Sequence, residues 1–124
     1  MKIAHAYAMV FITIALTVYG QFVIKWQVLR AGAMPHDFES RLMYFGRLLI
    51  NPWVLSALSA AFLASIAWMI AMTKLEISRA FPLTAITFIC ITLGGALLFK
   101  EPLTPLRILG VALLALGIIV SSQG

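Results

Sequence analysis

Acidic residues and cysteine are scarce in this chain: among 124 residues there are four Asp or Glu side chains and one cysteine. Cys90 cannot form an internal disulfide, and in its apolar stretch it is typical of a small buried hydrophobe. His5 and His36 stand without a third ligand, so no metal site is expected. The sequence also lacks a nucleophile paired with a base and a phosphate-binding loop. We therefore expect neither an enzyme nor a cofactor.

Long hydrophobic runs make up most of the chain. It is 63% hydrophobic and 10% charged, with a mean hydropathy of +1.05, far outside the range of soluble globular domains. A bilayer core takes roughly 20 helical residues to cross. We expect an all-α integral membrane bundle, a single domain over residues 1–124 with spans at about 3–28, 48–72, 79–99 and 104–120. The net charge of +5 favours anionic membrane lipids as partners and, lacking basic clusters among aromatics, not nucleic acid.

A polar connection follows the first span, with Pro35-His36-Asp37 as its turn signal. Phe38, Leu42 and Phe45 then recur at the spacing of one helix face. This pattern suits a short amphipathic helix at 37–46 in the headgroup layer, with Asp37 as its N-cap. A loose polar loop is the alternative.

The distribution of Lys and Arg predicts an orientation. An even number of spans places both termini on the same side, and cytoplasmic loops carry an excess of Lys and Arg. The first and third loops hold Arg30, Arg41, Arg47, Lys100 and Arg107, whereas the termini and the second loop hold Lys2, Lys74 and Arg79. This bias favours cytoplasmic first and third loops, with both termini outside.

A polar stripe runs along the first span. Thr17, Gln21 and Lys25 recur every four residues and so share one face, and no formal charge precedes Lys25 between Ile3 and Ile24. Exposed amide and ammonium groups are costly in lipid, so the stripe is expected to face the bundle interior or a wet cavity. Lys25 either contacts an anionic partner such as a lipid phosphate or snorkels to the interface.

Charged residues also stand at the ends of the third span. Arg79, at its start, either holds an anionic headgroup or anchors the interface. Glu101, beyond its end, is expected to pair with Lys100, Arg107 or Lys25, or to couple transport to a proton. The sequence leaves these alternatives open.

Two glycines mark the fourth span. Gly110 and Gly117 are seven residues apart, and small residues on one face let two helices approach closely. They predict a dimer contact, since four short helices do not easily enclose an aqueous path. The alternative is packing within the chain against the third span, where Gly94-Gly95 lies.

Three short motifs resemble those of a known family. Val18-Tyr19-Gly20-Gln21 is followed by Lys25, Ala80-Phe81-Pro82-Leu83 opens the third span, and Lys100-Glu101-Pro102-Leu103-Thr104-Pro105 precedes Gly110-Val111. Together they resemble the four-span form of the drug/metabolite transporter superfamily. The likeness is greatest to the subunits of the aminoarabinose-phosphoundecaprenol flippase, which are relatives of the small multidrug resistance family. It covers spans one, three and four.

The resemblance implies a transporter subunit in the bacterial inner membrane that flips a polyprenyl-phosphate-linked sugar, as a homodimer or as a heterodimer with a similar small subunit. Lys25, helped by Arg79, would neutralise the phosphate, and Gln21 and Thr17 would hydrogen-bond the headgroup. Glu101 would hold Lys25 or Arg107, or carry a coupling proton.

Drug exporters of the related family carry a glutamate three residues before the glycine of the first motif, where this chain has Thr17. Two other functions stay open. One is a small multidrug-type exporter of small cations or metabolites that uses another acid, such as Glu101. The other is a non-transporting accessory subunit of a membrane glycosyltransferase or larger carrier.

Overall fold

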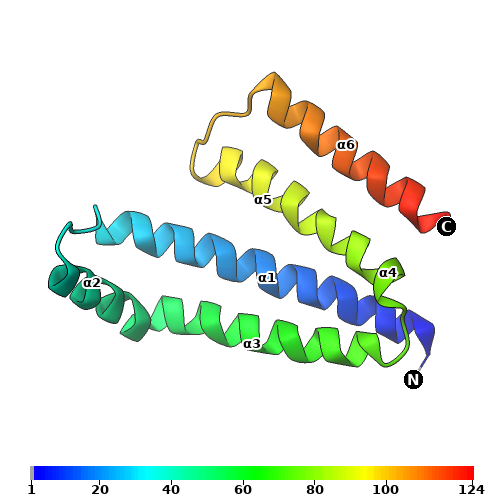
Figure 1. Ribbon diagram of the computed structural model, residues 1–124, viewed down its shortest axis with the longest axis horizontal. Helices are drawn as coiled ribbons and strands as arrows, with labels where there is room; N and C mark the ends of the chain where they lie inside the picture. The colour runs from blue at the N-terminus through cyan, green and yellow to red at the C-terminus, as the bar shows by residue number, and fades with distance from the viewer. Residues whose placement is uncertain (1) are drawn as a thin grey trace.

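Helices make up nearly all of the part of the chain that this computed structural model describes, residues 2–124 (Figure 1). In chain order they are α1 (Ile3–Ala31), α2 (Phe38–Ile50), α3 (Pro52–Met72), α4 (Ile77–Ala80), the 3-10 helix η1 (Phe81–Thr84), α5 (Ala85–Leu98) and α6 (Pro105–Ser122). Four stretches are long and apolar enough to cross a membrane, namely α1, α3, Ile77–Leu98 and α6. The expectation of an all-α, four-span protein is confirmed.

The closest packing lies between α1 and α3. The buried face of α3 is a seam of alanines with one valine, namely Val54, Ala57, Ala60, Ala64, Ala67 and Ala71. On α1, Gly20 faces this seam so closely that an added Cβ would lie 3.3 Å from the carbonyl oxygen of Ala57. Thr13 also donates to the carbonyl oxygen of Ala64 at 3.3 Å. Small residues let two backbones approach, and in lipid this packing replaces the hydrophobic drive that water would supply.

The third span is interrupted near its start. Pro82 lies in η1, between α4 and α5, because proline lacks the N–H that would continue the α-helical ladder. The adjoining Ala80 is fully buried against Val10, Ile14 and Ala71, which ties this break to the N-terminal half of α1.

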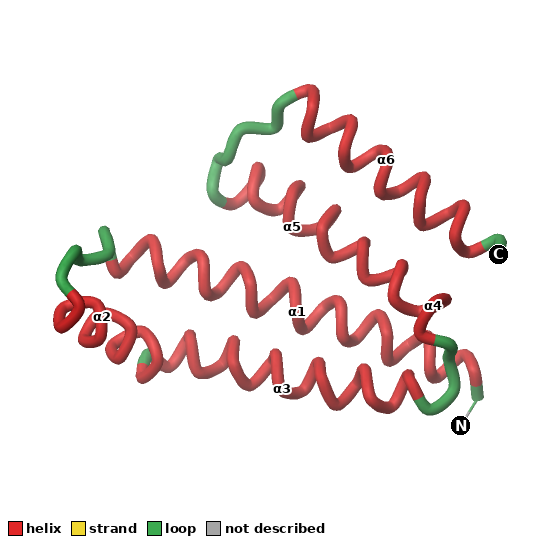
Figure 2. Tube along the Cα trace, viewed as in Figure 1, coloured by secondary structure: helices red, strands yellow, loops and turns green. Residues whose placement is uncertain are grey.

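In the hairpin of α5 and α6, α5 packs on α1, whereas α6 lies on the far side of α5 from the α1–α3 pair (Figure 2). Among the residues of this hairpin Gly95 alone is buried, and α6 has no buried residue. Cys90 is exposed, because it lies on a face of α5 that neither α1 nor α6 covers; the expectation that it is buried was wrong for the single chain.

The connections at one end of the bundle are capped by side chains. Asp37 accepts from the Ser40 backbone N–H at 3.1 Å, so residues 38–50 form a helix and not a loose loop. Asn51 accepts from the Trp53 N–H at 2.8 Å, and α3 begins at Pro52. Residues 48–50, expected in the second span, therefore belong to α2. Thr104 likewise caps α6. These connections lie at the opposite end of the bundle from both termini (Figure 1).

Candidate functional site

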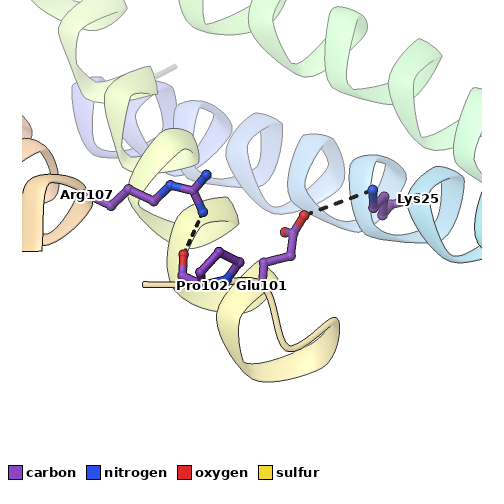
Figure 3. A network of polar contacts seen from close by, with 4 residues as sticks. All are labelled: Lys25, Glu101, Pro102 and Arg107. Carbon is purple, nitrogen blue, oxygen red and sulfur yellow. Dashed lines mark hydrogen bonds and ion pairs between the residues drawn. The ribbon is translucent and has the colours of Figure 1, made fainter. Parts of the chain in front are cut away.

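An ion pair joins α1 to the turn between α5 and α6. The Nζ of Lys25 lies 4.0 Å from Oε2 of Glu101 (Figure 3). Both side chains are 47% exposed, and a half-exposed pair at this separation contributes little to stability, about 0–1 kcal/mol. The structure thus places Glu101 beside Lys25, and it leaves the ammonium group able to take another anion.

The turn that carries Glu101 is built around a glycine. The backbone N–H of Glu101 donates to the Gly95 carbonyl oxygen at 3.3 Å. Lys100 has a φ of 54°, a left-handed conformation that reverses the chain at the end of α5. Because Gly95 has no Cβ, the Glu101 carboxylate occupies the space where one would stand. This position of the carboxylate brings its Oε2 to 4.0 Å from the Lys25 ammonium group.

Arg107 braces the same turn without contacting Glu101. Its Nη1 donates to the Pro102 carbonyl oxygen at 2.6 Å (Figure 3), and its backbone N–H donates to Oγ1 of Thr104 at 3.2 Å. Of the partners considered for Glu101, the structure therefore selects Lys25.

Thr17 and Gln21 line a cavity of about 610 Å³ between α1, α3 and the start of the third span. Its walls include Trp68, Phe81 and Phe88. The Thr17 hydroxyl donates to the Thr13 carbonyl oxygen at 2.7 Å and keeps lone pairs free to accept. Lys25 follows Gln21 by one helical turn on the same face. The polar stripe of α1 therefore leads from the cavity toward the ion pair.

Arg79 lies apart from these residues. It is in α4, near the N-terminal end of α1, whereas Lys25 is near the other end of that helix (Figure 1). Its Nη2 donates to the carbonyl oxygen of Gly124 at 2.8 Å. The structure therefore places the two cations at opposite ends of the bundle and does not bring them together.

The glycines of α6 and α5 have different surroundings. A Cβ added at Gly110 or at Gly117 would meet nothing within 4 Å, whereas one at Gly94 would collide with the ring of Phe22. The space beside Gly94 is thus occupied by Phe22 of α1, and the space beside Gly95 by Glu101. The α6 glycines face open space within the single chain.

The sequence argument did not predict a contact between Gln27 of α1 and Asn51, the N-cap of α3. Gln27 is only 4% exposed, and its Oε1 accepts from Nδ2 of Asn51 at 3.1 Å. The available signal was spacing, because Gly20, Val23 and Gln27 continue the α1 face that packs on α3.

Among residues 2–124 no group of three His, Cys, Asp or Glu is placed to hold a metal.

These features define a small four-span helical membrane protein with a partly exposed polar stripe on its first span. No protein-family model and no solved structure gives a significant match. A protein of Pseudomonas syringae pv. syringae is 31% identical over 104 residues, which cover 83% of this chain and 87% of the relative. A protein of Pseudomonas savastanoi pv. phaseolicola is 32% identical over 66 residues, and one of Pseudomonas aeruginosa is 29% identical over 70.

All three relatives carry the description "Probable 4-amino-4-deoxy-L-arabinose-phosphoundecaprenol flippase subunit ArnE". The chain belongs to this ArnE family of flippase subunits, a resemblance that the sequence motifs had predicted. In the Pseudomonas savastanoi and Pseudomonas aeruginosa alignments it spans 58% and 61% of the relative's length.

Proposed function

We propose that the protein is a non-enzymatic subunit of a bacterial inner-membrane flippase that moves a polyprenyl-phosphate-linked sugar across the bilayer. The names of the relatives support this, since they describe flippase subunits for phosphoundecaprenol-linked aminoarabinose. The observation that carries the proposal is the weak Lys25–Glu101 pair, which stands at one end of the polar stripe on α1.

Lys25 acts by exchanging one anion for another. A phosphate that leaves water for the bilayer loses its hydration, and an adjacent ammonium group offsets much of that cost. Because Lys25 is half-exposed and its carboxylate partner lies 4.0 Å away, a lipid phosphate can replace Glu101 with little loss of stability. Glu101 pairs with Lys25 again when the phosphate leaves.

The cavity serves the uncharged part of the headgroup. Thr17 and Gln21 offer hydrogen bonds to sugar hydroxyls, and Trp68, Phe81 and Phe88 supply apolar walls. The polyprenyl chain stays in the surrounding lipid. Arg79 stands at the other end of the bundle, where it would receive the phosphate on the opposite side of the membrane.

A second small subunit completes the transporter. The open faces at Gly110 and Gly117 and the absence of buried residues in α6 support α6 as the contact. The partner is a second copy or a similar small subunit.

A multidrug-type exporter fits these residues less well. Such an exporter needs an acid that binds a proton and a cationic drug in turn. In the described part of the chain, the lining of the cavity includes no Asp or Glu, and Thr17 stands at the expected acidic position.

Reconstitution tests the proposal. The purified chain, alone and with a similar small subunit, is placed in proteoliposomes that contain undecaprenyl-phosphate-linked aminoarabinose, and the lipid exposed on each leaflet is labelled at its amine. We expect faster transbilayer movement of this lipid than of phosphatidylethanolamine, whose headgroup amine takes the same label. Movement no faster than in protein-free liposomes for both preparations would reject the proposal.

A further inference from the structure

A second cavity, of about 510 Å³, lies between the C-terminal end of α1, α2 and the start of α3. We call it the basic cavity; the residues that matter in its lining are Gln27, Arg30, Tyr44, Arg47, Asn51 and Trp53. Its volume lies within the range of roughly 300–1,000 Å³ that small-molecule sites occupy. It shares no lining residue with the cavity of Thr17 and Gln21.

The basic cavity has two cationic side chains and no acidic one among its described lining residues. Three other arginines, Arg41, Arg79 and Arg107, each donate to a backbone carbonyl. Within residues 2–124, Arg30 and Arg47 form no hydrogen bond or ion pair with protein groups, and the one ion pair is that of Lys25 with Glu101. Two unneutralised guanidinium groups in one cavity favour an anion.

Arg30 is already oriented at the rim of the basic cavity. Its guanidinium carbon lies 5.6 Å from the ring centroid of Trp26, within the range of a cation–π contact. The Trp26 ring in turn packs edge-to-face on Trp53, with centroids 5.3 Å apart. A guanidinium group held over an aromatic face loses less rotamer freedom on binding a planar or tetrahedral anion.

Gln27 supplies a donor without a partner. Asn51 holds its Oε1, as described above, and this contact fixes the direction of the amide. The Nε2 of Gln27 is buried and has no hydrogen-bond partner within the described chain. An unsatisfied buried donor is costly, about 1–3 kcal/mol. An acceptor oxygen in the cavity, which Gln27 lines, would remove that cost.

The helix that forms one wall is suited to the membrane surface. Phe38, Leu42, Phe45 and Leu49 lie on one face of α2 and are all exposed, which suits a helix lying in the interfacial plane. Arg47 and Tyr44 lie on other faces, and the Tyr44 hydroxyl donates to the Gly32 carbonyl oxygen at 3.0 Å. The basic cavity then lies at headgroup depth.

We propose that the basic cavity binds the phosphate of a membrane lipid headgroup, with Arg30 and Arg47 as the cationic contacts and Gln27 as a neutral donor. The site is separate from Lys25. The phosphate comes either from the lipid-linked sugar, which then binds here before reaching Lys25, or from a bulk anionic phospholipid that fixes α2. Only the first source rests on the proposed function.

Lipid binding by native mass spectrometry tests the site. The Lys25→Ala background removes the other phosphate contact proposed at this end of the bundle, and in it Arg47→Gln is compared with Arg41→Gln, which removes the same charge from the same helix outside the cavity. The probes are undecaprenyl phosphate, phosphatidylglycerol and the uncharged diacylglycerol. We expect Arg47→Gln or Arg30→Gln to raise the Kd of one phosphate lipid about tenfold, Arg47→Lys to raise it less, and Arg41→Gln to leave it within about twofold.

The outcomes separate the two lipid sources and the two proposals. An effect on undecaprenyl phosphate identifies the transported lipid class as ligand, and an effect on phosphatidylglycerol alone identifies bulk lipid. Equal Kd values for Arg47→Gln and Arg41→Gln, or no phosphate lipid retained in the Lys25→Ala background, would overturn the site. Because binding is measured without transport, the site can stand when translocation fails, and translocation can succeed when the site is absent.

Discussion

The carboxylate of Glu101 lies against Gly95, in the space that a side chain on α5 would fill. This contact brings a residue of the α5–α6 turn to within 4.0 Å of Lys25 on α1. The position of the only described ion pair therefore depends on one missing Cβ atom.

Gly95→Ala is expected to displace Glu101 and free Lys25. The competing carboxylate is then lost, so undecaprenyl phosphate should bind about two- to fivefold more tightly, as expected for an exposed pair. Glu101→Gln should give a shift of the same sign and similar size, measured by native mass spectrometry. Gly46→Ala is the control, because its Cβ would meet nothing within 4 Å and it lies outside the proposed subunit contact. Weaker binding in Gly95→Ala would contradict the role of Glu101 as a competitor.

Gly94→Ala is expected to loosen the contact between α1 and α5. The new methyl group would collide with the ring of Phe22, which also packs on Phe99 with ring centroids 6.1 Å apart. Overpacking of this kind costs about 1–3 kcal/mol, seen as a lower unfolding temperature in detergent. Gly46→Ala, whose Cβ would meet nothing within 4 Å, is the control. Adding Phe22→Leu to Gly94→Ala should recover part of the loss. Equal unfolding temperatures for both alanine variants would show that Phe22 moves freely aside.

Asn51 has two separable roles. Asn51→Ala removes the cap of α3 and the donor to Gln27, and losing an N-cap costs about 1 kcal/mol of unfolding free energy. Asn51→Asp keeps an oxygen for the Trp53 N–H but loses the Nδ2 donor. We expect the unfolding temperature to fall for both variants, and further for alanine. An aspartate variant as stable as the original protein would show that the Gln27 contact contributes nothing.

The α2 helix should depend on pH through Asp37. Hydrogen bonds from Ser40, the backbone one foremost, keep the pKa of this carboxyl below its ordinary value. A group with a lowered folded-state pKa stabilises the helix above its unfolded pKa, and the contribution disappears as the pH falls through the folded value. Hydrogen exchange in residues 38–41 should therefore quicken, relative to α3, below about pH 4. Asp37→Asn should abolish that pH dependence; if it persists, another group is responsible.

Hydropathy was enough to predict the four spans, because each uncharged run is long enough to cross a bilayer. The loops between them contain charge, and the first and third also contain proline. Hydropathy could not predict the α1–α3 seam. Alanines at 57, 60, 64, 67 and 71 are apolar, as lipid-facing residues also are, so periodicity in hydrophobicity does not mark the buried face.

The candidate site was predicted in part. Thr17 and Gln21 could be placed on one face from helical spacing alone, and the structure puts both in one cavity. The sequence could not predict which cation pairs with Glu101. That contact depends on how α5 packs against α1 and on the space beside Gly95 that the Glu101 carboxylate occupies. The sequence likewise could not predict that Arg30, Arg47 and Gln27 line one cavity, because this cavity forms only when α2 folds back toward α1.

Transbilayer movement with and without the Lys25 ammonium group tests the central claim most directly. Proteoliposomes containing the original protein, Lys25→Ala or Lys100→Ala, each with the similar small subunit if required, are compared for movement of undecaprenyl-phosphate-linked aminoarabinose. Lys100 is the matched control, because it lies next to Glu101 and forms no ion pair within the described residues. We expect Lys25→Ala to reduce the rate at least about tenfold, and Lys100→Ala to leave it nearly unchanged. An unchanged rate in Lys25→Ala would contradict the phosphate role of Lys25.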